Sequence, residues 1–251
     1  MPSFTSFDET RISYHDEGDG DPVLLLHGFA SDARGNWGGP GVIRALVAAG
    51  RRVVAPDARG HGASGKPHDP VAYADGAMVK DAKALLDHLG AERVDLAGYS
   101  MGAMVSAYLA TDEPRIRRLV LGGMGGALVK GRRPGATTAI ADALEADDPA
   151  TVADPTARGF RAFADSTGAD RLALAAVQRS SQFSERPDLG RITAPTLVLV
   201  GDGDDLVGPP QPLADAIPGT TVRIVAGDHL TAVADPAFPS AIVEFLSVAE
   251  V

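Results

Sequence analysis

The sequence contains no cysteine. This absence excludes disulfide bonds, thiolate metal sites, iron–sulfur clusters and a cysteine nucleophile. A chain that needs no disulfides is suited to a reducing compartment, and we expect a cytoplasmic protein. Aromatic residues are also scarce, at 5% of the 251 residues, so stacking platforms for nucleic-acid bases are not expected.

Positive charge is in deficit. The chain has 23 Lys and Arg against 33 Asp and Glu, which gives a net charge of -10 at pH 7. A nucleic-acid partner normally requires a basic patch, so we expect none. Basic and acidic residues cancel over residues 123–191, and the excess negative charge therefore lies in the rest of the chain. We interpret it as a soluble surface rather than as a device that steers a cationic ligand.

Long hydrophobic runs are missing as well. The longest tight apolar stretch, residues 23–26, has the length of a strand, far below the ~20 residues of a membrane span. Residues 1–9 have neither the basic nor the apolar region of a signal peptide. We therefore expect no membrane partner and no targeting segment.

Short β-rich runs alternate with helical stretches along most of the chain. Strands are predicted over 4–7, 11–15, 23–26, 52–55, 93–97, 118–121, 196–200 and 221–225. Helices are predicted over 41–49, 76–89, 102–110, 209–216 and 238–247. This alternation predicts an α/β fold with a mostly parallel central sheet and helices on both faces.

The alternation stops between residues 123 and 191. This part has no convincing strand and carries three helix-like stretches, 137–146, 156–165 and 169–183. We expect a small helical cap at 123–191, inserted into a core made of 1–122 and 192–251. Such a cap would lie over the carboxyl ends of the strands, where open α/β sheets bind their ligands.

The segment 98–102 lies directly between a predicted strand and a predicted helix, and its sequence is Gly-Tyr-Ser-Met-Gly. A turn this tight strains its middle residue and exposes that side chain above the sheet, at a helix N-terminus. Flanking glycines allow the strand and the helix to approach each other. The alternative is a glycine-rich turn with a capping serine. We predict that Ser100 is a nucleophile.

A serine hydroxyl needs a base to become nucleophilic. His229 lies in the loop after the last predicted strand, where it could reach Ser100. The alternative for His229 is an ordinary loop histidine. His27, in the loop after the strand at 23–26, is expected to anchor that loop rather than to act as a base.

The base in turn needs an acid, which should follow another strand. Three carboxylates follow the strand at 196–200, and we choose Asp204, with Asp205 as the runner-up and Asp202 as a turn residue. Their spacing resembles the start of a calcium loop, but the glycine and the later glutamate that this loop requires are missing. No metal is therefore expected.

Acyl transfer also needs donors for a developing oxyanion. The backbone N–H of Met101, which follows the predicted nucleophile, is one candidate. The second should come from the loop at 27–30, and the N–H of Phe29 is the candidate there.

Ser100, Asp204 and His229 occur in the order nucleophile, acid, base, and the His-Gly pair at 27–28 precedes them. In this the chain resembles the α/β-hydrolase fold superfamily, as a single-domain, esterase-like member. The segment 57–64 and Trp37 also match positions common in that family, where the segment is structural. The resemblance covers nearly the whole chain and is weakest over the expected cap.

The resemblance implies a cofactor-independent serine hydrolase that acts on a small ester, lactone or thioester through an acyl-enzyme. Family members that open epoxides or remove halides carry Asp in place of Ser100, and dienelactone-type members carry Cys, so those reactions are discounted. Two alternatives stay open: a hydrolase of C–C bonds beside a carbonyl, and a receptor-like member that binds a small molecule without turnover. The partner expected is a small-molecule acyl substrate; the oligomeric state is left open.

Overall fold

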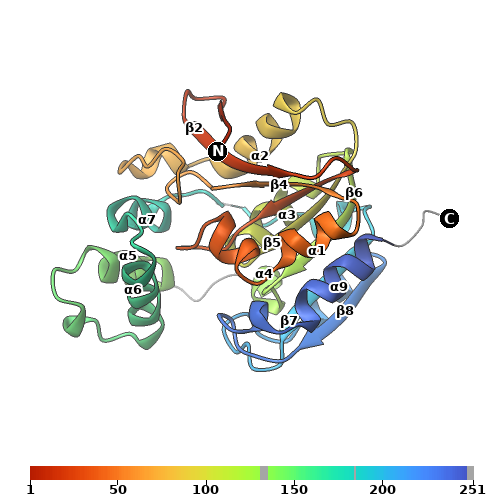
Figure 1. The fold of residues 1–251 in the computed structure, drawn as a ribbon. Helices are drawn as coiled ribbons and strands as arrows, with labels where there is room; N and C mark the ends of the chain where they lie inside the picture. Colours follow the sequence, from red (N-terminus) through yellow and green to blue (C-terminus); the bar gives the residue numbers. More distant parts are fainter. Residues whose placement is uncertain (131–134, 184, 248–251) are drawn as a thin grey trace.

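An eight-stranded sheet forms the centre of the molecule, in a computed structural model that describes residues 1–130, 135–183 and 185–247 (Figure 1). The strands are β1 (Ser3–Thr5), β2 (Arg11–Glu17), β3 (Pro22–Leu26), β4 (Arg52–Pro56), β5 (Val94–Tyr99), β6 (Ile116–Gly122), β7 (Thr196–Gly201) and β8 (Thr220–Val225). Their order is β1-β2-β4-β3-β5-β6-β7-β8. Strand β2 pairs antiparallel with both of its neighbours, β1 and β4, and all other pairs are parallel. The predicted fold class is confirmed.

Parallel pairing brings the carboxyl ends of distant strands to one edge of the sheet. Tyr99 at the end of β5 is in register with Gly122 of β6, and Gly201 of β7 is in register with Val225 of β8. The loops that follow β5, β7 and β8 therefore emerge side by side, although they are far apart in the sequence.

Both faces of the sheet are buried. Successive side chains of a strand point to opposite faces, so Val23 and Leu25 of β3 pack with one cluster and Leu24 and Leu26 with the other. The first cluster includes side chains of α1 (Val42–Ala48) and α9 (Ala237–Leu246), and the second those of α2 (Ala77–His88), α3 (Met101–Ala110) and α8 (Gln211–Ala216). Burial on two faces explains why these strands read as continuous apolar runs.

Between β6 and β7 the described residues contain helices and no strand. The helices are α4 (Gly126–Lys130), α5 (Ala136–Glu145), α6 (Pro155–Thr167) and α7 (Arg171–Arg179). Figure 1 shows α5, α6 and α7 grouped as a lobe to one side of the sheet. Asp154 and Asp170 begin α6 and α7 by accepting hydrogen bonds from backbone N–H groups of the first turn. Residues 131–134 and 184 of the expected cap lie outside the described residues.

Some element boundaries differ from the expected ones. The first strand ends at Thr5 rather than at residue 7, because Ser6 makes other hydrogen bonds. Its hydroxyl donates to the Asp81 carboxylate, and its N–H donates to the Thr10 carbonyl oxygen. The last helix of the lobe ends at Arg179, well before residue 183. Short helices that were not predicted include a π-helix at Arg34–Gly38 and 3-10 helices at Pro70–Tyr73, Pro149–Thr151, Leu189–Arg191 and Ala232–Ala234.

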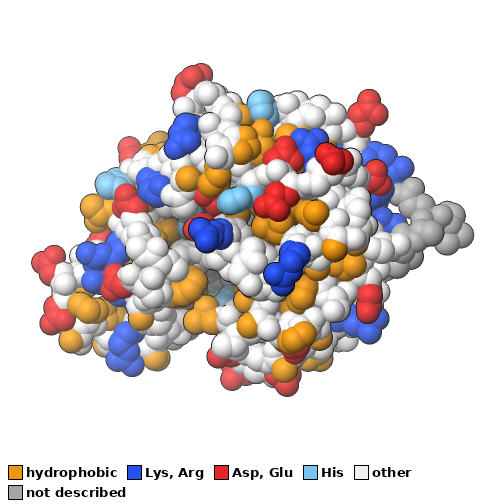
Figure 2. All heavy atoms as spheres, in the orientation of Figure 1, with side chains coloured by type: hydrophobic (Ala, Val, Ile, Leu, Met, Phe, Trp, Pro, Cys, Tyr) orange, Lys and Arg blue, Asp and Glu red, His pale blue; other side chains and the backbone are white. Residues whose placement is uncertain are grey.

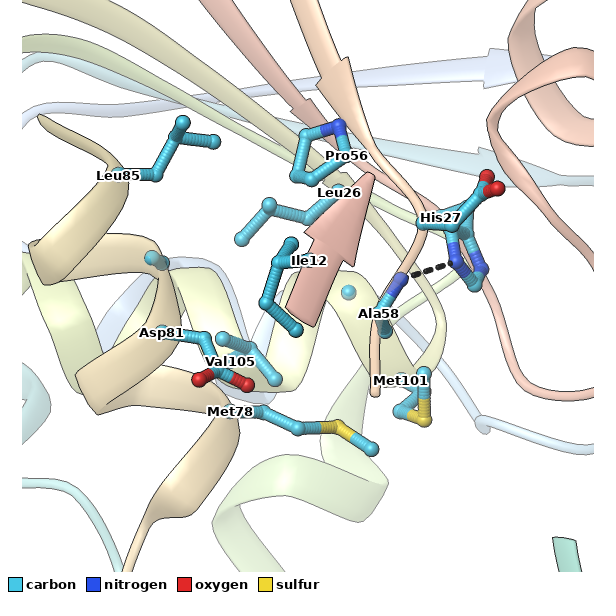
Figure 3. Close-up of a pocket in the computed structure, with 13 residues that line it drawn as sticks. Ile12, Leu26, His27, Pro56, Ala58, Met78, Asp81, Leu85, Met101 and Val105 are labelled. Carbon is cyan, nitrogen blue, oxygen red and sulfur yellow. Dashed lines mark hydrogen bonds between the residues drawn. The ribbon is translucent and has the colours of Figure 1, made fainter. Parts of the chain in front are cut away.

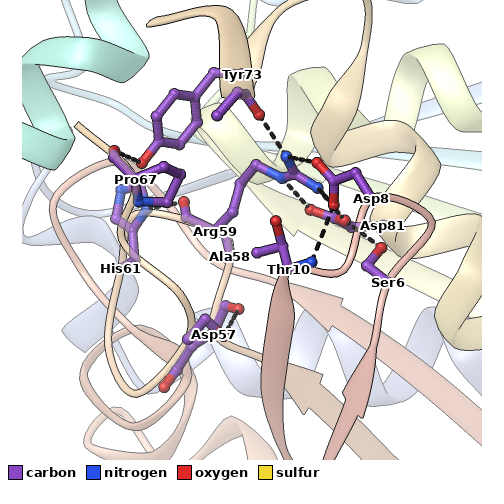
Figure 4. A network of polar contacts seen from close by, with 12 residues as sticks. Ser6, Asp8, Thr10, Asp57, Ala58, Arg59, His61, Pro67, Tyr73 and Asp81 are labelled. Atoms are coloured by element: carbon purple, nitrogen blue, oxygen red, sulfur yellow. Dashed lines mark hydrogen bonds and ion pairs between the residues drawn. The ribbon is translucent and has the colours of Figure 1, made fainter. Parts of the chain in front are cut away.

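A fully buried arginine fixes the segment 57–64 (Figure 4). The Arg59 guanidinium donates to both carboxylate oxygens of Asp81 on α2, at 2.6 and 2.7 Å, and to Asp8 at 2.8 Å. It also donates to the carbonyl oxygen of Ala72. Burial lowers the pKa of Arg59, but the hydrogen bonds to the two carboxylates outweigh burial and raise it, so the cation is retained. The structural role implied for this segment fits these contacts.

None of the helices in the described ranges combines the length and hydrophobicity that a membrane-spanning segment needs.

Candidate active site

Ser100 lies at the turn between β5 and α3, with φ 51° and ψ −110°. This is a conformation that residues other than glycine rarely adopt. The glycines on either side are required by space: an added Cβ at Gly98 would lie 2.3 Å from the carbonyl oxygen of Gly102, and one at Gly102 would lie 2.0 Å from that of Leu26. The chain thus forms the strained strand-to-helix turn that the sequence predicted.

The structure brings the three predicted side chains into one hydrogen-bonded chain. His229 Nε2 lies 2.9 Å from Ser100 Oγ, and His229 Nδ1 lies 2.8 Å from Asp204 Oδ2. The Asp204 carboxylate is almost fully buried, whereas the neighbouring Asp205 is exposed, and it is Asp204 that hydrogen-bonds to His229. Asp202 accepts a hydrogen bond from the backbone N–H of Gly227, which fits the turn role expected for it.

These distances assign a tautomer to the imidazole. A carboxylate can only accept, so Nδ1 carries the proton that is donated to Asp204. Nε2 of His229 then presents its lone pair to the Ser100 hydroxyl. This is the arrangement in which a histidine can take the proton of a serine.

Two backbone N–H groups remain available beside Ser100. Neither Phe29 nor Met101 donates its N–H to any residue in the described part of the chain. Met101 is the first residue of α3, where backbone N–H groups have no partner within the helix. The loop that carries Phe29 passes close to Ser100, since a Cβ added at Gly28 would lie 3.5 Å from the Cβ of Ser100.

Two buried side chains hold this loop in place. His27 donates from Nδ1 to the carbonyl of Gly28 at 2.8 Å, and its Nε2 accepts from the N–H of Ala58 at 2.9 Å. Burial lowers the pKa of His27, so the ring stays neutral. Asn36 accepts from the N–H of Gly28 at 2.7 Å. The anchoring role expected of His27 is confirmed, whereas Asn36 was not predicted.

Tyr99, inside the turn itself, is a second residue that the sequence analysis missed. Its hydroxyl donates to the backbone carbonyl oxygen of His229 at 2.6 Å, and its ring lies 5.6 Å from the His229 ring. Gly123 leaves room for the ring, because an added Cβ there would lie 2.6 Å from Tyr99 Cζ. The pair Gly122-Gly123 at the end of β6 could have indicated that a large side chain packs there, but not that this side chain is Tyr99.

A cavity of about 270 Å³ opens beside His229. Its walls are one face of α6, with Phe160 and Phe163, and the loops at 203–206 and 228–230. The ring of Phe160 also contacts that of Phe29, at 5.6 Å between centroids. Figure 2 shows the surface hollowed between the lobe of α5–α7 and the rest of the molecule, with hydrophobic side chains on both sides.

A second, internal cavity lies between α2, α3 and the sheet (Figure 3). Its volume is about 30 Å³, and its walls include Met78, Leu85, Met101 and Val105. This space is of the size of one water molecule, and its walls are mostly apolar. It is too small for a substrate, so the cavity beside His229 is the candidate substrate site.

No group of three or more His, Asp or Glu side chains in the described ranges is arranged to hold a metal ion.

Comparison with known proteins gives the family. A family model described as alpha/beta hydrolase fold matches residues 21–149. RutD of Variovorax paradoxus (strain S110), which is named for carbamate hydrolysis, is 31% identical over 93% of this chain and 94% of its own length. The chain belongs to the α/β-hydrolase fold family.

Other relatives of this α/β hydrolase match only in part. A 2-hydroxymuconate semialdehyde hydrolase of Pseudomonas putida is 40% identical over 114 residues, which are 45% of this chain. The chain spans about two fifths of the length of the first curated relatives it matches.

Among solved structures, a hydrolase from Pseudomonas aeruginosa PA01 is similar with a TM-score of 0.80 and 28% identity, covering 98% of each chain. A thermophilic esterase from Thermogutta terrifontis is similar with a TM-score of 0.74 and 26% identity, over 98% of this α/β hydrolase and 97% of that chain.

Proposed function

We propose that this α/β hydrolase is a cofactor-independent serine hydrolase that cleaves a small ester, lactone or thioester. The observation that carries the proposal is the hydrogen-bonded chain from Asp204 through His229 to Ser100, with the serine in a strained turn above the sheet. A buried acid, an oriented base and a partly exposed hydroxyl are the parts that acyl transfer to a serine needs.

The reaction follows from the positions of these groups. Ser100 Oγ attacks the substrate carbonyl carbon while His229 Nε2 takes the hydroxyl proton. The N–H groups of Phe29 and Met101 donate to the oxyanion of the tetrahedral intermediate. His229 then gives its proton to the leaving group, whose bond to the carbonyl carbon breaks and leaves an acyl-enzyme. Water then attacks the acyl carbon while His229 takes its proton. The bond between this carbon and Ser100 Oγ breaks as His229 returns the proton to Oγ, which releases the acid. Throughout, Asp204 stabilises the imidazolium.

In this proposal the helices of 123–191 act as the cap over the site. Phe160 of α6 packs on Phe29 beside the nucleophile, and the hydroxyl of Thr167 donates to the carbonyl of Ala30 at 3.2 Å. These contacts support a lobe that closes one side of the substrate cavity.

A hydrolase of C–C bonds is the second candidate. It is favoured by the similarity of 45% of the chain to a 2-hydroxymuconate semialdehyde hydrolase. The same nucleophile, base and acid would serve that reaction, with a carbon leaving group in place of an alkoxide.

Substitution of the nucleophile tests the proposal. Ser100→Ala should fold normally and lose at least about 10³-fold in kcat on p-nitrophenyl acetate, because only oxyanion binding and substrate binding remain. A fluorophosphonate probe should label Ser100 in the unaltered chain. Ser240→Ala, on the exposed face of α9, is the matched control and should keep full activity. Rates of Ser100→Ala within tenfold of the unaltered protein would refute the assignment, and binding of esters without turnover would indicate a receptor.

A further inference from the structure

The cavity of about 270 Å³ lies on the base side of the site. His229 forms part of its wall, and the ring edge that carries Nε2 faces Ser100. The base must deliver its proton to the leaving group, so the leaving group of any substrate lies next to His229. The acyl chain is a different substituent of the carbonyl carbon that Ser100 attacks, so it extends away from the leaving group. The cavity is therefore on the leaving-group side of the substrate.

The walls of the cavity are largely apolar. Phe160 and Phe163 face it from α6, and Leu206 and Leu230 contribute from the opposite loops. The two leucines are unusually open to solvent for apolar side chains, at 46% and 55% exposure. An apolar substituent bound between them and α6 would remove this surface from water.

Three carboxylates border the same cavity: Asp204, Asp205 and Asp228. Asp204 is hydrogen-bonded to His229, whereas Asp205 and Asp228 are exposed at the rim of the cavity. Asp228 Oδ1 accepts hydrogen bonds from the N–H groups of Leu230 and Thr231, both at 2.9 Å, and from the Thr231 hydroxyl. These hydrogen bonds hold the pKa of Asp228 below its usual value, so the carboxylate is ionised at neutral pH.

No Lys or Arg is among the described residues that line the cavity. Helix α6 carries two arginines, and neither is among the lining residues. Arg158 is exposed, whereas Arg161 is buried. Arg161 donates to the carbonyl oxygens of Ala143 and Ala146 at 2.8 and 2.6 Å, and to Asp165 at 2.8 Å. A carboxylate placed in the cavity would thus meet like charges without a cation in the described part of the site.

We propose that this cavity is the leaving-group subsite, and that it selects substrates whose leaving group is apolar and uncharged or cationic while it rejects those with a carboxylate there. This inference rests on the proposed serine hydrolase. It also separates the two candidate functions. A muconate semialdehyde carries its carboxylate on the carbon chain that leaves when the aldehyde carbon is attacked, so the C–C reaction would place an anion in this cavity.

Two matched pairs of acetates test the selection by charge. Acetylcholine (cationic) is paired with its isostere 3,3-dimethylbutyl acetate (uncharged), and 3-acetoxypropanoate (anionic) is paired with its isostere 3-acetoxypropanamide (uncharged). We expect kcat/KM for the anionic ester to be at least about tenfold below that for its uncharged partner, because Asp205 and Asp228 line the cavity and repel a like charge. Comparable rates for the anionic and uncharged esters would overturn the charge selection.

A carboxylate variant identifies the groups responsible. Asp205→Asn should raise the ratio of anionic to uncharged kcat/KM several-fold. Asp19→Asn, at the opposite edge of the sheet, is the matched control and should leave the ratio unchanged. We compare the ratio of anionic to uncharged kcat/KM because a general loss of activity lowers both values equally and leaves their ratio unchanged. An unchanged ratio in both Asp205→Asn and Asp228→Asn would contradict the role of these carboxylates.

Two ester series test the position of the subsite. In alkyl acetates from ethyl to hexyl, each added methylene should raise kcat/KM up to about fourfold, the equivalent of about 0.8 kcal/mol, until the cavity is full. Phe163→Ala, or Phe163→Leu if the first variant is unstable, should flatten or shift this alcohol-chain profile. The profile for ethyl esters of acids from acetate to octanoate should keep its shape. Leu172→Ala, an exposed position on α7, is the control.

The outcomes are distinct. If the acid-chain profile changes in the Phe163 variants and the alcohol-chain profile does not, the cavity is an acyl subsite and this inference is wrong while the serine hydrolase stands. If no ester of either series is hydrolysed, the proposed function itself fails.

Discussion

The Tyr99 hydroxyl donates a hydrogen bond of 2.6 Å to the backbone carbonyl oxygen of His229. The residue before Ser100 thus holds the loop that carries His229. Burial raises the pKa of Tyr99, so the hydroxyl keeps its proton and remains a donor. The ring of Phe238 packs against the Tyr99 ring at 5.7 Å and limits its movement.

Loss of this hydrogen bond should weaken catalysis more than substrate binding. We expect Tyr99→Phe to lower kcat about fivefold to fiftyfold with little change in KM, because a small displacement of His229 affects proton transfer rather than ground-state contacts. Tyr73→Phe is a matched control. Tyr73 is also buried and donates to a backbone carbonyl at 2.6 Å, that of Pro67, away from the site. Equal kcat losses in the two variants would show a general structural effect.

The choice between neighbouring carboxylates can be tested directly. Asp204→Asn should reduce kcat on ethyl acetate by about 10³- to 10⁴-fold, because an amide no longer fixes the Nδ1–H tautomer of His229 or stabilises the imidazolium. Asp205→Asn should change kcat on this small uncharged ester less than threefold. Steady-state kinetics on both variants check the prediction, and the reverse ranking would assign the acid to Asp205.

The stability of the fold should fall as the pH is lowered because of a buried histidine. His61 is almost fully buried, its Nδ1 donates to the Arg59 carbonyl, and its Nε2 has no partner among the described residues. Burial and the neighbouring His27 lower the pKa of His61 from 6.5 to about 3. Below pH 6.5 the unfolded chain therefore binds a proton that the folded chain does not, and the free energy of unfolding decreases.

Urea unfolding at pH 7 and pH 5 measures this effect. At pH 5 the loss due to His61 is about 2 kcal/mol, from about 1.4 kcal/mol for each pH unit below 6.5. His61→Gln keeps a donor for the Arg59 carbonyl and cannot titrate, so its loss between the two pH values should be smaller by that amount. Burial also lowers the pKa of His27, so some loss should persist in the variant. Parallel losses in the two proteins would show that His61 is protonated in the folded state.

The turn around Ser100 should not tolerate a single methyl group. A Cβ at Gly102 would lie 2.0 Å from the carbonyl oxygen of Leu26, and backbone cannot move aside cheaply. We expect Gly102→Ala to cost about 3 kcal/mol or more in the free energy of unfolding. Ala103→Gly in the same helix, where the cost is the ordinary helix propensity of about 1 kcal/mol plus a lost buried methyl, is a comparison by thermal unfolding. A Tm for Gly102→Ala equal to that of the unaltered chain would contradict the close approach.

Much of the fold could be predicted because its central strands, β3 to β7, are buried on both faces. Runs such as 23–26 are then apolar without interruption, and the helices between them have an amphipathic period. Boundaries that depend on distant partners could not be predicted. The end of β1 is decided by Asp81, which lies 75 positions from Ser6 in the sequence.

In the candidate site too, residues constrained by their local sequence could be predicted, and residues that depend on distant partners could not. Ser100 could be predicted because its constraint is local, namely a glycine on each side within one turn. Asp204 and His229 could be predicted because each follows a strand that the sequence indicates. The structure brings both side chains together with Ser100, and their catalytic roles remain predictions. Tyr99 could not be found in this way, because its partner is a backbone carbonyl 130 positions away that leaves no signal in the sequence.

The separation of 129 positions between Ser100 and His229 has a consequence for newly made chains. During synthesis the strand and helix that flank Ser100 leave the ribosome before β7 and β8 exist. A nascent chain therefore carries Ser100 without His229, and under the proposed function it should not hydrolyse esters until β8 pairs with β7. Such long-range pairing is slow compared with local helix formation. The appearance of hydrolytic activity after refolding would accordingly report the docking of the last strands, whereas helical circular dichroism would report earlier steps.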